Sequence, residues 1–236
     1  MIASVLLTRP AGSEAELGRR LTDMGFRVHA VPTVLIEPAL GPLPATAGFD
    51  WVVVTSPNGA RRLRGLELGS SSTRWAAVGA ATAEALAEIG VNVDVVPLRA
   101  SAMALPEAMA ALRPLRGDRV LLLRGDLAGS ELPRELERLG AEVVDEVVYH
   151  TRIGPPQSRA ELELALGDPG LRAVILASGS AAEGVCLLHG SAPSVGAITI
   201  GPRTSSEAAR LGFKILAEAS QPGLEGLLRA TVEHLG

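Results

Sequence analysis

Short apolar runs alternate along the chain with segments in which apolar residues recur every three or four positions. The runs at 3–8, 51–55, 119–123 and 173–177 are almost wholly apolar, as is typical of strands buried on both faces of a parallel sheet. The long run 26–36 and the run 91–96 are also predicted to be strands. The segment 131–139 has the spacing of an amphipathic helix and ends at Gly140, a residue type that commonly stops helices. This alternation predicts an α/β protein with parallel sheets and right-handed connections.

The second half of the chain repeats the first. The sequence Val-Leu-Leu-Thr-Arg at 5–9 matches Val-Leu-Leu-Leu-Arg at 120–124, and Gly25 matches Gly140 at the same offset. Repeats of this length indicate a duplicated domain, so we expect two similar lobes. A second set of matches, at its own constant offset, pairs Ser56 with Ser178, Gly79 with Gly201, Thr82 with Thr204 and Gly90 with Gly212.

Polar residues and glycines gather where the predicted strands end. Open parallel sheets bind ligands outside the carboxyl ends of their strands, so these positions form the candidate site. Tyr149, the only tyrosine, closes another long strand-like run and by itself predicts a half-buried aromatic side chain. The residues at the other strand ends are Thr8, Arg9, Ser56, Gly79, Arg124, Ser178, Ser180 and Gly201.

The helix starts in this set allow two interpretations. In Gly79–Thr82 and in Gly201–Thr204, a glycine turn leads from a strand to a threonine at a helix start. The threonine either caps its helix, which contributes about 1 kcal/mol, or binds an anion together with free backbone N–H groups. The same choice applies to a second set of residues, Ser56, Asn58, Ser178 and Ser180.

Composition and charge exclude several classes of function. The net charge is −4 and Lys214 is the only lysine, which argues against a general nucleic-acid surface. The single cysteine, Cys186, and the scattered histidines form no disulfide or metal-binding pattern. Neither a phosphate-binding loop, a dinucleotide-binding glycine motif nor a serine nucleophile elbow occurs. We therefore expect no metal and no organic cofactor.

The start of the chain bears on where the protein acts. The first residues carry no basic region, and Arg9-Pro10 interrupts the opening apolar run too early for a signal peptide or a membrane span. We therefore expect a cytoplasmic protein without membrane contact.

Taken together, the motifs resemble those of the uroporphyrinogen-III synthase family, whose members close hydroxymethylbilane, a linear tetrapyrrole, into a macrocycle with ring D inverted. The similarity extends in order over nearly the whole chain, and its specificity lies in the sum of the motifs. The loop 177–180 departs from the family, which more often has a threonine and a proline around the serine. The matching motifs are Leu7-Thr8-Arg9-Pro10, Phe49-Asp50-Trp51 before Thr55-Ser56-Pro57-Asn58-Gly59, Val78-Gly79 with Thr82, Val147-Val148-Tyr149-His150-Thr151, and Ile200-Gly201-Pro202 with Thr204.

The resemblance implies a particular domain arrangement. From the repeat alone, two tandem lobes divided near residue 114 fit equally well. The family instead has two flavodoxin-like lobes with parallel sheets, joined by a two-stranded connector. Here, lobe 1 would combine 1–36 with 154–236, lobe 2 would span 39–148, and the connector strands would lie near 31–38 and 146–153.

The resemblance also implies the reaction and its residues. The chain would be a lyase that cyclises hydroxymethylbilane with loss of water, through a spiro intermediate, and its lobes would close on the substrate by hinge motion. Tyr149 would be catalytic and assist the departing hydroxyl. The substrate would be bound by Thr8, Arg9, Ser56, Asn58, Gly79, Thr82, Arg124, Ser178, Ser180, Gly201, Pro202 and Thr204.

The resemblance suggests transient contact with the upstream hydroxymethylbilane synthase. We expect a monomer, because no apolar helix is left over after the two lobes are assigned, and no binding of nucleic acid, because the net charge is −4. The alternative hypothesis is a non-enzymatic, two-lobed cytosolic binding protein for a small anionic ligand.

Overall fold

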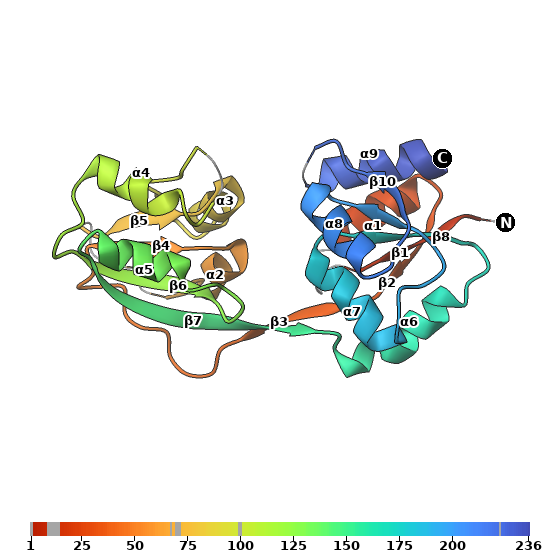
Figure 1. The fold of residues 1–236 in the computed structure, drawn as a ribbon, viewed down its shortest axis with the longest axis horizontal. Coiled ribbons are helices and arrows are strands. Elements are labelled where there is room, and N and C mark those ends of the chain that lie inside the picture. The colour runs from red at the N-terminus through yellow and green to blue at the C-terminus, as the bar shows by residue number, and fades with distance from the viewer. Residues whose placement is uncertain (1, 9–14, 67, 69–71, 99–100, 222) are drawn as a thin grey trace. The chain divides into compact units, whose positions relative to one another are not determined.

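The structure, a computed structural model, describes residues 2–8, 15–66, 68, 72–98, 101–221 and 223–236. Residue contacts divide the chain into two compact units (Figure 1). Unit 1 consists of Met1–Leu35 and Arg152–Gly236, and unit 2 of Ile36–Thr151. Each unit contains one five-stranded, largely parallel sheet, which confirms the predicted α/β class with two parallel sheets.

The sheet of unit 1 has the strand order β10-β9-β8-β1-β2, with parallel pairing throughout. When the five strands are numbered along the chain within the unit and the sheet is read from the β2 edge, the order is 2-1-3-4-5, as in flavodoxin-like folds. The strands are β1 (Ser4–Leu7), β2 (Arg27–Ala30), β8 (Leu171–Leu176), β9 (Ala197–Thr199) and β10 (Ile215–Glu218).

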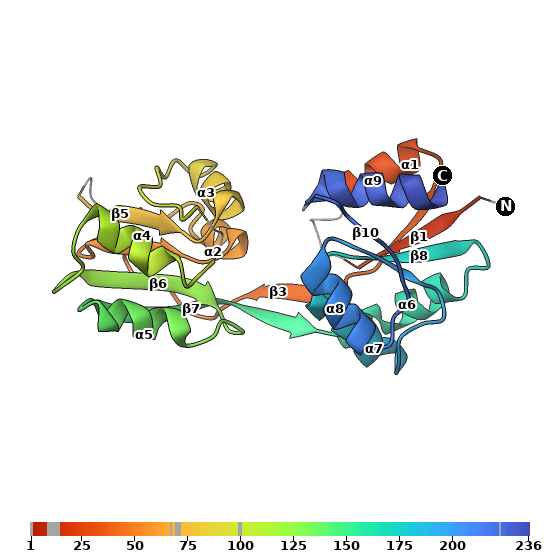
Figure 2. The same cartoon turned by 45° about the horizontal axis from the view of Figure 1, so that its top comes forward.

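Helices cover both faces of this sheet (Figures 1 and 2). On one face, α1 (Ala15–Asp23) and α9 (Leu224–Leu235) bury Leu17, Leu21 and Leu227 against β1 and β8. On the other face lie η1 (Pro156–Ser158), α6 (Arg159–Leu166), α7 (Gly179–His189) and α8 (Pro202–Arg210).

The sheet of unit 2 has the order β3-β7-β6-β4-β5. Its strands are β3 (Val34–Pro38), β4 (Trp51–Val54), β5 (Arg74–Ala77), β6 (Arg119–Gly125) and β7 (Glu142–Ile153). One face is covered by α2 (Pro57–Arg62) and α3 (Ala80–Ala87), the other by α4 (Leu105–Leu112) and α5 (Glu131–Arg138).

Strand β3 runs opposite to its neighbour β7. The Gly154 N–H donates to the Thr33 carbonyl at 2.9 Å, and the Ala39 N–H donates to the Val148 carbonyl at 3.2 Å. These two bonds join the start of β3 to the end of β7, and the end of β3 to the middle of β7, which requires antiparallel strands. The boundary between the units falls within both strands.

The two units share one strand order, but the chain forms the equivalent strands in a different sequence in each unit. By the sequence repeat, β6 and β7 correspond to β1 and β2, and β4 and β5 correspond to β8 and β9. Their spatial order β7-β6-β4-β5 therefore reproduces β2-β1-β8-β9. A single parallel bridge from Ala76 to Val95 stands in the place of β10. The predicted similarity of the lobes is confirmed at the level of sheet topology.

Two predicted strands differ from the structure. The run 26–36 is not one strand, because β2 ends at Ala30 and β3 begins at Val34, with Pro32, which has no N–H to donate, between them. The run 91–96, predicted to be a strand, forms only a single bridge, at Val95. The Asp94 carboxylate accepts the Trp75 N–H at 2.7 Å, in place of a backbone carbonyl of a neighbouring strand. In the described part of the chain, no helix has the length and apolar character needed to cross a membrane.

Candidate active site

The predicted site residues of unit 2 lie at one edge of its sheet. Ser56 follows β4, Gly79 follows β5, and Arg124 and Tyr149 lie in the last parts of β6 and β7 that pair with each other. Because these four strands are parallel, their carboxyl ends meet at the same edge. The structure therefore brings these four residues to one side of one unit.

Tyr149 occupies a bulge at this edge. Arg124 pairs with Val147, but the next residue, Gly125, pairs with Tyr149, so Val148 is an extra residue in β7. The tyrosine ring lies directly over Gly125: a Cβ added there would be 2.5 Å from the ring atoms Cε2 and Cζ. Only glycine leaves room for the ring in this position. The sequence places Gly125 at a strand end, but nothing in it indicates that an aromatic ring covers this residue.

Ser56 connects the start of α2 to this tyrosine. Its Oγ accepts the Gly59 N–H at 3.1 Å, so Ser56 is the N-cap of α2. The same hydroxyl donates a hydrogen bond to Tyr149 Oη at 2.9 Å. A predicted binding residue and the predicted catalytic residue, far apart in the chain, are thus in direct contact.

Asn58 and Arg124 make contacts within the protein. Asn58 Oδ1 accepts a hydrogen bond from Arg61 Nη1 at 3.1 Å. Arg124 Nε donates to Asp145 Oδ1 at 2.5 Å, and its Nη2 donates to the other oxygen of that carboxylate. Its Nη1 donates to the Ala128 carbonyl at 3.2 Å and also to the next carbonyl. These bonds hold the loop after β6 against β7, and the Arg124 side chain is only 12% exposed.

Gly79 and Thr82 have distinct roles at the start of α3. Gly79 is the N-cap, with extended backbone and no side chain to accept a bond from the helix N–H groups. The Thr82 N–H is already bonded to the Gly79 carbonyl at 3.1 Å, and the Thr82 side chain is buried. The interpretation of Thr82 as the cap is therefore wrong. The first turn of α3 keeps N–H groups that no capping side chain accepts.

Unit 1 repeats this arrangement at the carboxyl edge of its own sheet. Gly201 is the N-cap of α8 without a capping side chain, and Thr204 is buried in the first turn. Pro202 is the first residue of the helix and has no N–H to contribute. Ser178 caps α7 by accepting the Ala181 N–H at 3.2 Å, and Ser180 is half-buried in the first turn of that helix.

Thr8 lies in the core of unit 1, and its hydroxyl is bonded within the protein. It is fully buried, and its hydroxyl donates to the Ile175 carbonyl of β8 at 2.8 Å. Its own carbonyl accepts a bond from the Thr33 hydroxyl at 3.2 Å. Arg9, the predicted binding residue that follows it, lies outside the described residues.

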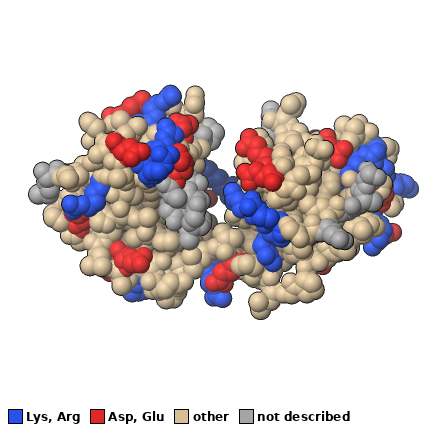
Figure 3. All heavy atoms as spheres, turned by 180° about the vertical axis from the view of Figure 1, so that it is seen from behind, with Lys and Arg blue, Asp and Glu red and all other residues tan. Residues whose placement is uncertain are grey.

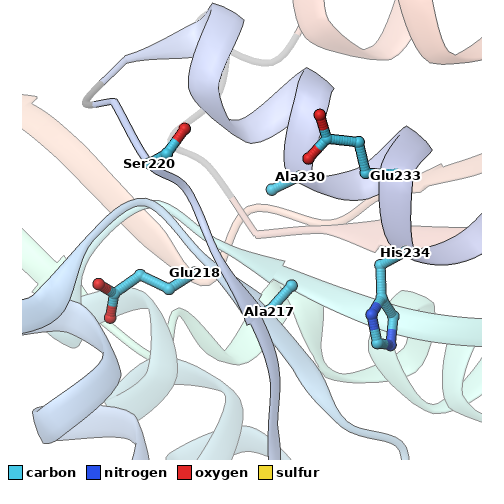
Figure 4. Close-up of a pocket in the computed structure, with 6 residues that line it drawn as sticks. All are labelled: Ala217, Glu218, Ser220, Ala230, Glu233 and His234. Carbon is cyan, nitrogen blue, oxygen red and sulfur yellow. The ribbon is translucent and has the colours of Figure 1, made fainter.

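Three cavities of the structure are lined by none of the predicted site residues, although the first includes Glu218, the last residue of β10. One of about 210 Å³ is lined by Glu218, Glu233 and His234 together with small residues, and these three side chains point in different directions (Figure 4). Two others, of about 470 and 420 Å³, contain none of the predicted site residues. Within the described ranges, no group of three or more His, Cys, Asp and Glu side chains lies close enough together to hold a metal ion.

The most strongly perturbed carboxylate lies at the opposite edge of unit 1. Asp168 accepts hydrogen bonds at 2.8 Å from His29 Nε2, from the Gly170 N–H and from the Ser4 hydroxyl. The His29 ring first, then these two other donors, hold the pKa of the Asp168 carboxyl well below its usual range. Because Ser4 begins β1, this cluster lies at the amino end of the sheet and braces the strand.

Neither unit presents a surface of a single charge in the view of Figure 3, where acidic and basic side chains are interspersed on both. This agrees with the net charge of −4 and with the absence of a basic excess.

Comparison with known proteins identifies relatives over nearly the whole chain. A sequence model described as "Uroporphyrinogen-III synthase HemD" matches residues 15–229. The uroporphyrinogen-III synthase of Synechococcus elongatus is 29% identical over 250 residues, covering 96% of this chain and 93% of that protein. The enzyme of the same name from Chlorobaculum parvum is 27% identical, covering 90% of this chain and 91% of that protein.

Solved structures share the fold. Uroporphyrinogen-III synthetase from Helicobacter pylori aligns with a TM-score of 0.69 at 18% identity, over 98% of this chain and 99% of that one. A mutant uroporphyrinogen III synthase from Thermus thermophilus aligns with a TM-score of 0.65 at 21% identity, over 99% and 98%. All these names are those of an enzyme, so the alternative of a non-enzymatic binding protein receives no support.

Proposed function

We infer the function of this chain from one premise: it belongs to the uroporphyrinogen-III synthase family, whose sequence model matches residues 15–229. The protein is accordingly a lyase of tetrapyrrole biosynthesis. We propose that it converts hydroxymethylbilane into uroporphyrinogen III and releases water.

The reaction requires a leaving hydroxyl and control of ring closure. A proton joins the hydroxyl of the hydroxymethyl group, water leaves, and an electrophilic azafulvene remains. Ring D attacks it through its substituted α-carbon, and the spiro intermediate then fragments and closes again with ring D inverted. The proton that ring D loses from its free α-carbon on becoming aromatic again balances the proton used to release water. Because the same azafulvene closes without inversion in the absence of enzyme, the protein must act mainly by positioning.

Tyr149 is the proposed proton or hydrogen-bond donor to the departing hydroxyl. Its phenol lies at the carboxyl edge of the unit 2 sheet, where parallel sheets bind ligands. It belongs to the motif 147–151, which is part of the similarity to the family.

The helix starts at these edges are the proposed binding sites for the substrate carboxylates. Both Gly79 and Gly201 lack a capping side chain, so the first turns of α3 and α8 keep N–H groups, other than that of Thr82, that are available to an anion. Neutral N–H donors also bind carboxylates with a smaller desolvation cost than a dense cluster of charges. Thr82 and Thr204 would support these turns, and Ser56, Asn58, Ser178 and Ser180 line the neighbouring helix starts.

We also propose the wider setting of the reaction. Hydroxymethylbilane closes spontaneously to the wrong isomer, so rapid transfer from the upstream hydroxymethylbilane synthase through transient contact is favoured. The protein would act in the cytoplasm as a monomer. The strands near 31–38 and 146–153 would serve as the connector between lobes formed by 1–36 with 154–236 and by 39–148.

A product assay tests the function directly. Purified protein is incubated with freshly prepared hydroxymethylbilane, and the uroporphyrins formed after oxidation are separated by isomer. We expect the type III isomer to predominate, and heat-inactivated protein to give type I. If intact protein gives only type I, the proposed function is wrong.

A further inference from the structure

The hydroxyl of Ser56 accepts one hydrogen bond and donates another. Its Oγ accepts the Gly59 N–H at 3.1 Å and donates to Tyr149 Oη at 2.9 Å. A serine hydroxyl has a single hydrogen, which is here committed to the phenol oxygen. The phenol is therefore the acceptor of this bond, and its own hydrogen is left for another partner.

The backbone at Tyr149 is fixed independently of Ser56. The Asp126 N–H donates to the Tyr149 carbonyl at 3.2 Å, and Arg62 Nε donates to the Val148 carbonyl at 3.1 Å. The ring itself lies over Gly125, with no side chain beneath it. Removal of the Ser56 hydroxyl would thus leave the strand in place while it releases the phenol end of the ring and removes the cap of α2.

We propose that Ser56 is a positioning residue for Tyr149. It holds the phenol oxygen through a donated hydrogen bond, so that the hydrogen of the phenol is directed away from Ser56 and is available to the departing hydroxyl of the substrate. This role rests on the proposed function, and it distinguishes Ser56 from a residue that only caps α2. Gly125 contributes by leaving the space in which the ring is held.

The chain offers a matched control for the capping role. Ser178 caps α7 in unit 1 through the Ala181 N–H at 3.2 Å, with nearly the same extended backbone as Ser56. The only tyrosine of the chain belongs to unit 2. Ser56→Ala and Ser178→Ala therefore remove the same kind of cap, but only the first removes a bond to a tyrosine.

The experiment uses the single tyrosine as a reporter. Protein containing tyrosine labelled with ¹³C at Cζ gives one signal, which responds to hydrogen bonding at Oη. We expect Ser56→Ala to shift this signal, Ser178→Ala to leave it unchanged, and Ser56→Thr, which keeps the hydroxyl, to stay near the parent. An unshifted signal in Ser56→Ala would overturn the proposal, whether or not the chain makes the type III isomer.

Kinetics provide the second measurement. Loss of one hydrogen bond should lower kcat of Ser56→Ala by about three- to tenfold, with little change in KM, because the bond acts on the donor and not on substrate affinity. In the Tyr149→Phe background, the same change should have no further effect on kcat. An equal loss of kcat from Ser56→Ala in the parent and in the Tyr149→Phe variant would refute the positioning role. A shifted Cζ signal with the parental kcat would do the same. Neither result would affect the outcome of the product assay.

Gly125→Ala tests the same bond with the Ser56 hydroxyl intact. Its new Cβ would lie within 2.5 Å of the Tyr149 ring and must displace it. We expect a shifted Cζ signal, a lower kcat, and non-additive effects in the double variant with Ser56→Ala. Fully additive losses of kcat would show that the two residues act separately and would contradict the proposal.

Discussion

At the scale of single residues, Tyr149 is held on three sides. Gly125 lies under its ring, Ser56 binds its hydroxyl, and the Asp126 N–H binds its carbonyl. These contacts provide the restraint that the proposed role of Tyr149 as a general acid requires, because such a group must be held close to one orientation to act. None of the three partners is a neighbour of Tyr149 in the sequence, so the sequence indicated the residue but not its support.

We predict that Tyr149→Phe lowers turnover by about 10²- to 10⁴-fold, the range expected for loss of a general acid. Phenylalanine keeps the aromatic ring and its packing over Gly125, so the fold should be retained. The unfolding free energy should fall only by about 0.5–1.5 kcal/mol, because the Ser56 hydroxyl loses its acceptor. Steady-state formation of the type III isomer and thermal unfolding measure the two effects. Unchanged turnover would remove Tyr149 from the chemistry.

Asp168 leads to a prediction about acid stability. Its pKa is lowered in the folded state, first by His29, so its contribution to stability is present above the pKa of an unfolded aspartate, about 3.9. That contribution is lost as the pH falls below this value toward the folded pKa. We expect Asp168→Asn to be less stable than the parent at neutral pH and to lose less stability between about pH 4 and pH 2.

Denaturant unfolding at a series of pH values measures this difference. The control is Asp23→Asn, which removes an exposed carboxylate of α1 whose only described contact is a 3.5 Å pair with Arg19. If the unfolding free energies of the parent and Asp168→Asn fall equally as the pH is lowered, Asp168 does not stabilise the fold in the way described.

At the scale of elements, two helical glycines predict opposite effects of one substitution. Gly184 in α7 touches the segment before β3, and an added Cβ would lie 2.1 Å from the Thr33 carbonyl oxygen. Gly18 in α1 has only ordinary contacts, with Leu7 Cδ1 at 3.5 Å and Val28 Cγ1 at 3.7 Å. Helix α7 therefore needs its glycine for close packing, whereas α1 does not.

We predict that Gly184→Ala destabilises unit 1 by about 1–3 kcal/mol, because a backbone atom must move to admit the methyl group. Gly18→Ala should instead leave stability unchanged or raise it by up to about 1 kcal/mol, since alanine favours the helix. Chemical denaturation of both variants provides the comparison. Equal stability of the two variants would show that α7 can shift without cost.

The hydrophobic pattern predicted most elements, and its failures have local causes. The uniformly apolar runs became β1, β4, β6 and β8, because strands buried on both faces leave a strong signal. The run 26–36 also looked like one strand, but Pro32 breaks the ladder and the chain passes from one sheet to the other. The side chain of Asp94 replaced a ladder bond in the run 91–96, and such a substitution has no signature in hydropathy.

At the scale of the whole molecule, one strand order is built twice from different chain segments. Unit 1 assembles its sheet from both ends of the chain, whereas unit 2 assembles the equivalent sheet from the middle. The repeat in the sequence is compatible with this arrangement and with a tandem one, because β4 and β5 are equivalent to β8 and β9, and either pair could complete the sheet begun by β1 and β2.

Ligand binding offers a test at this scale. Uroporphyrinogen III, prepared without oxygen, should raise the melting temperature, since a ligand at a hundredfold excess over its Kd stabilises the folded state by about 2.7 kcal/mol. Glucose and glutamate at equal concentration should give no shift. Thermal unfolding monitored by circular dichroism measures both. Stabilisation by the sugar or amino acid but not by the tetrapyrrole would favour a binding protein over the enzyme.

The sequence by itself determined the alternation of strands and helices, the duplication and the family, because these depend on local periodicity and on motifs that are contiguous in the chain. It also located Tyr149 and the glycine and serine turns at strand ends. Only the tertiary structure decided that Gly79 and Gly201, rather than the threonines, begin their helices. It also decided that Arg124 is engaged within the protein and that Ser56 binds Tyr149. These outcomes depend on where side chains from distant segments meet, which is set by strand register and the bulge at Val148.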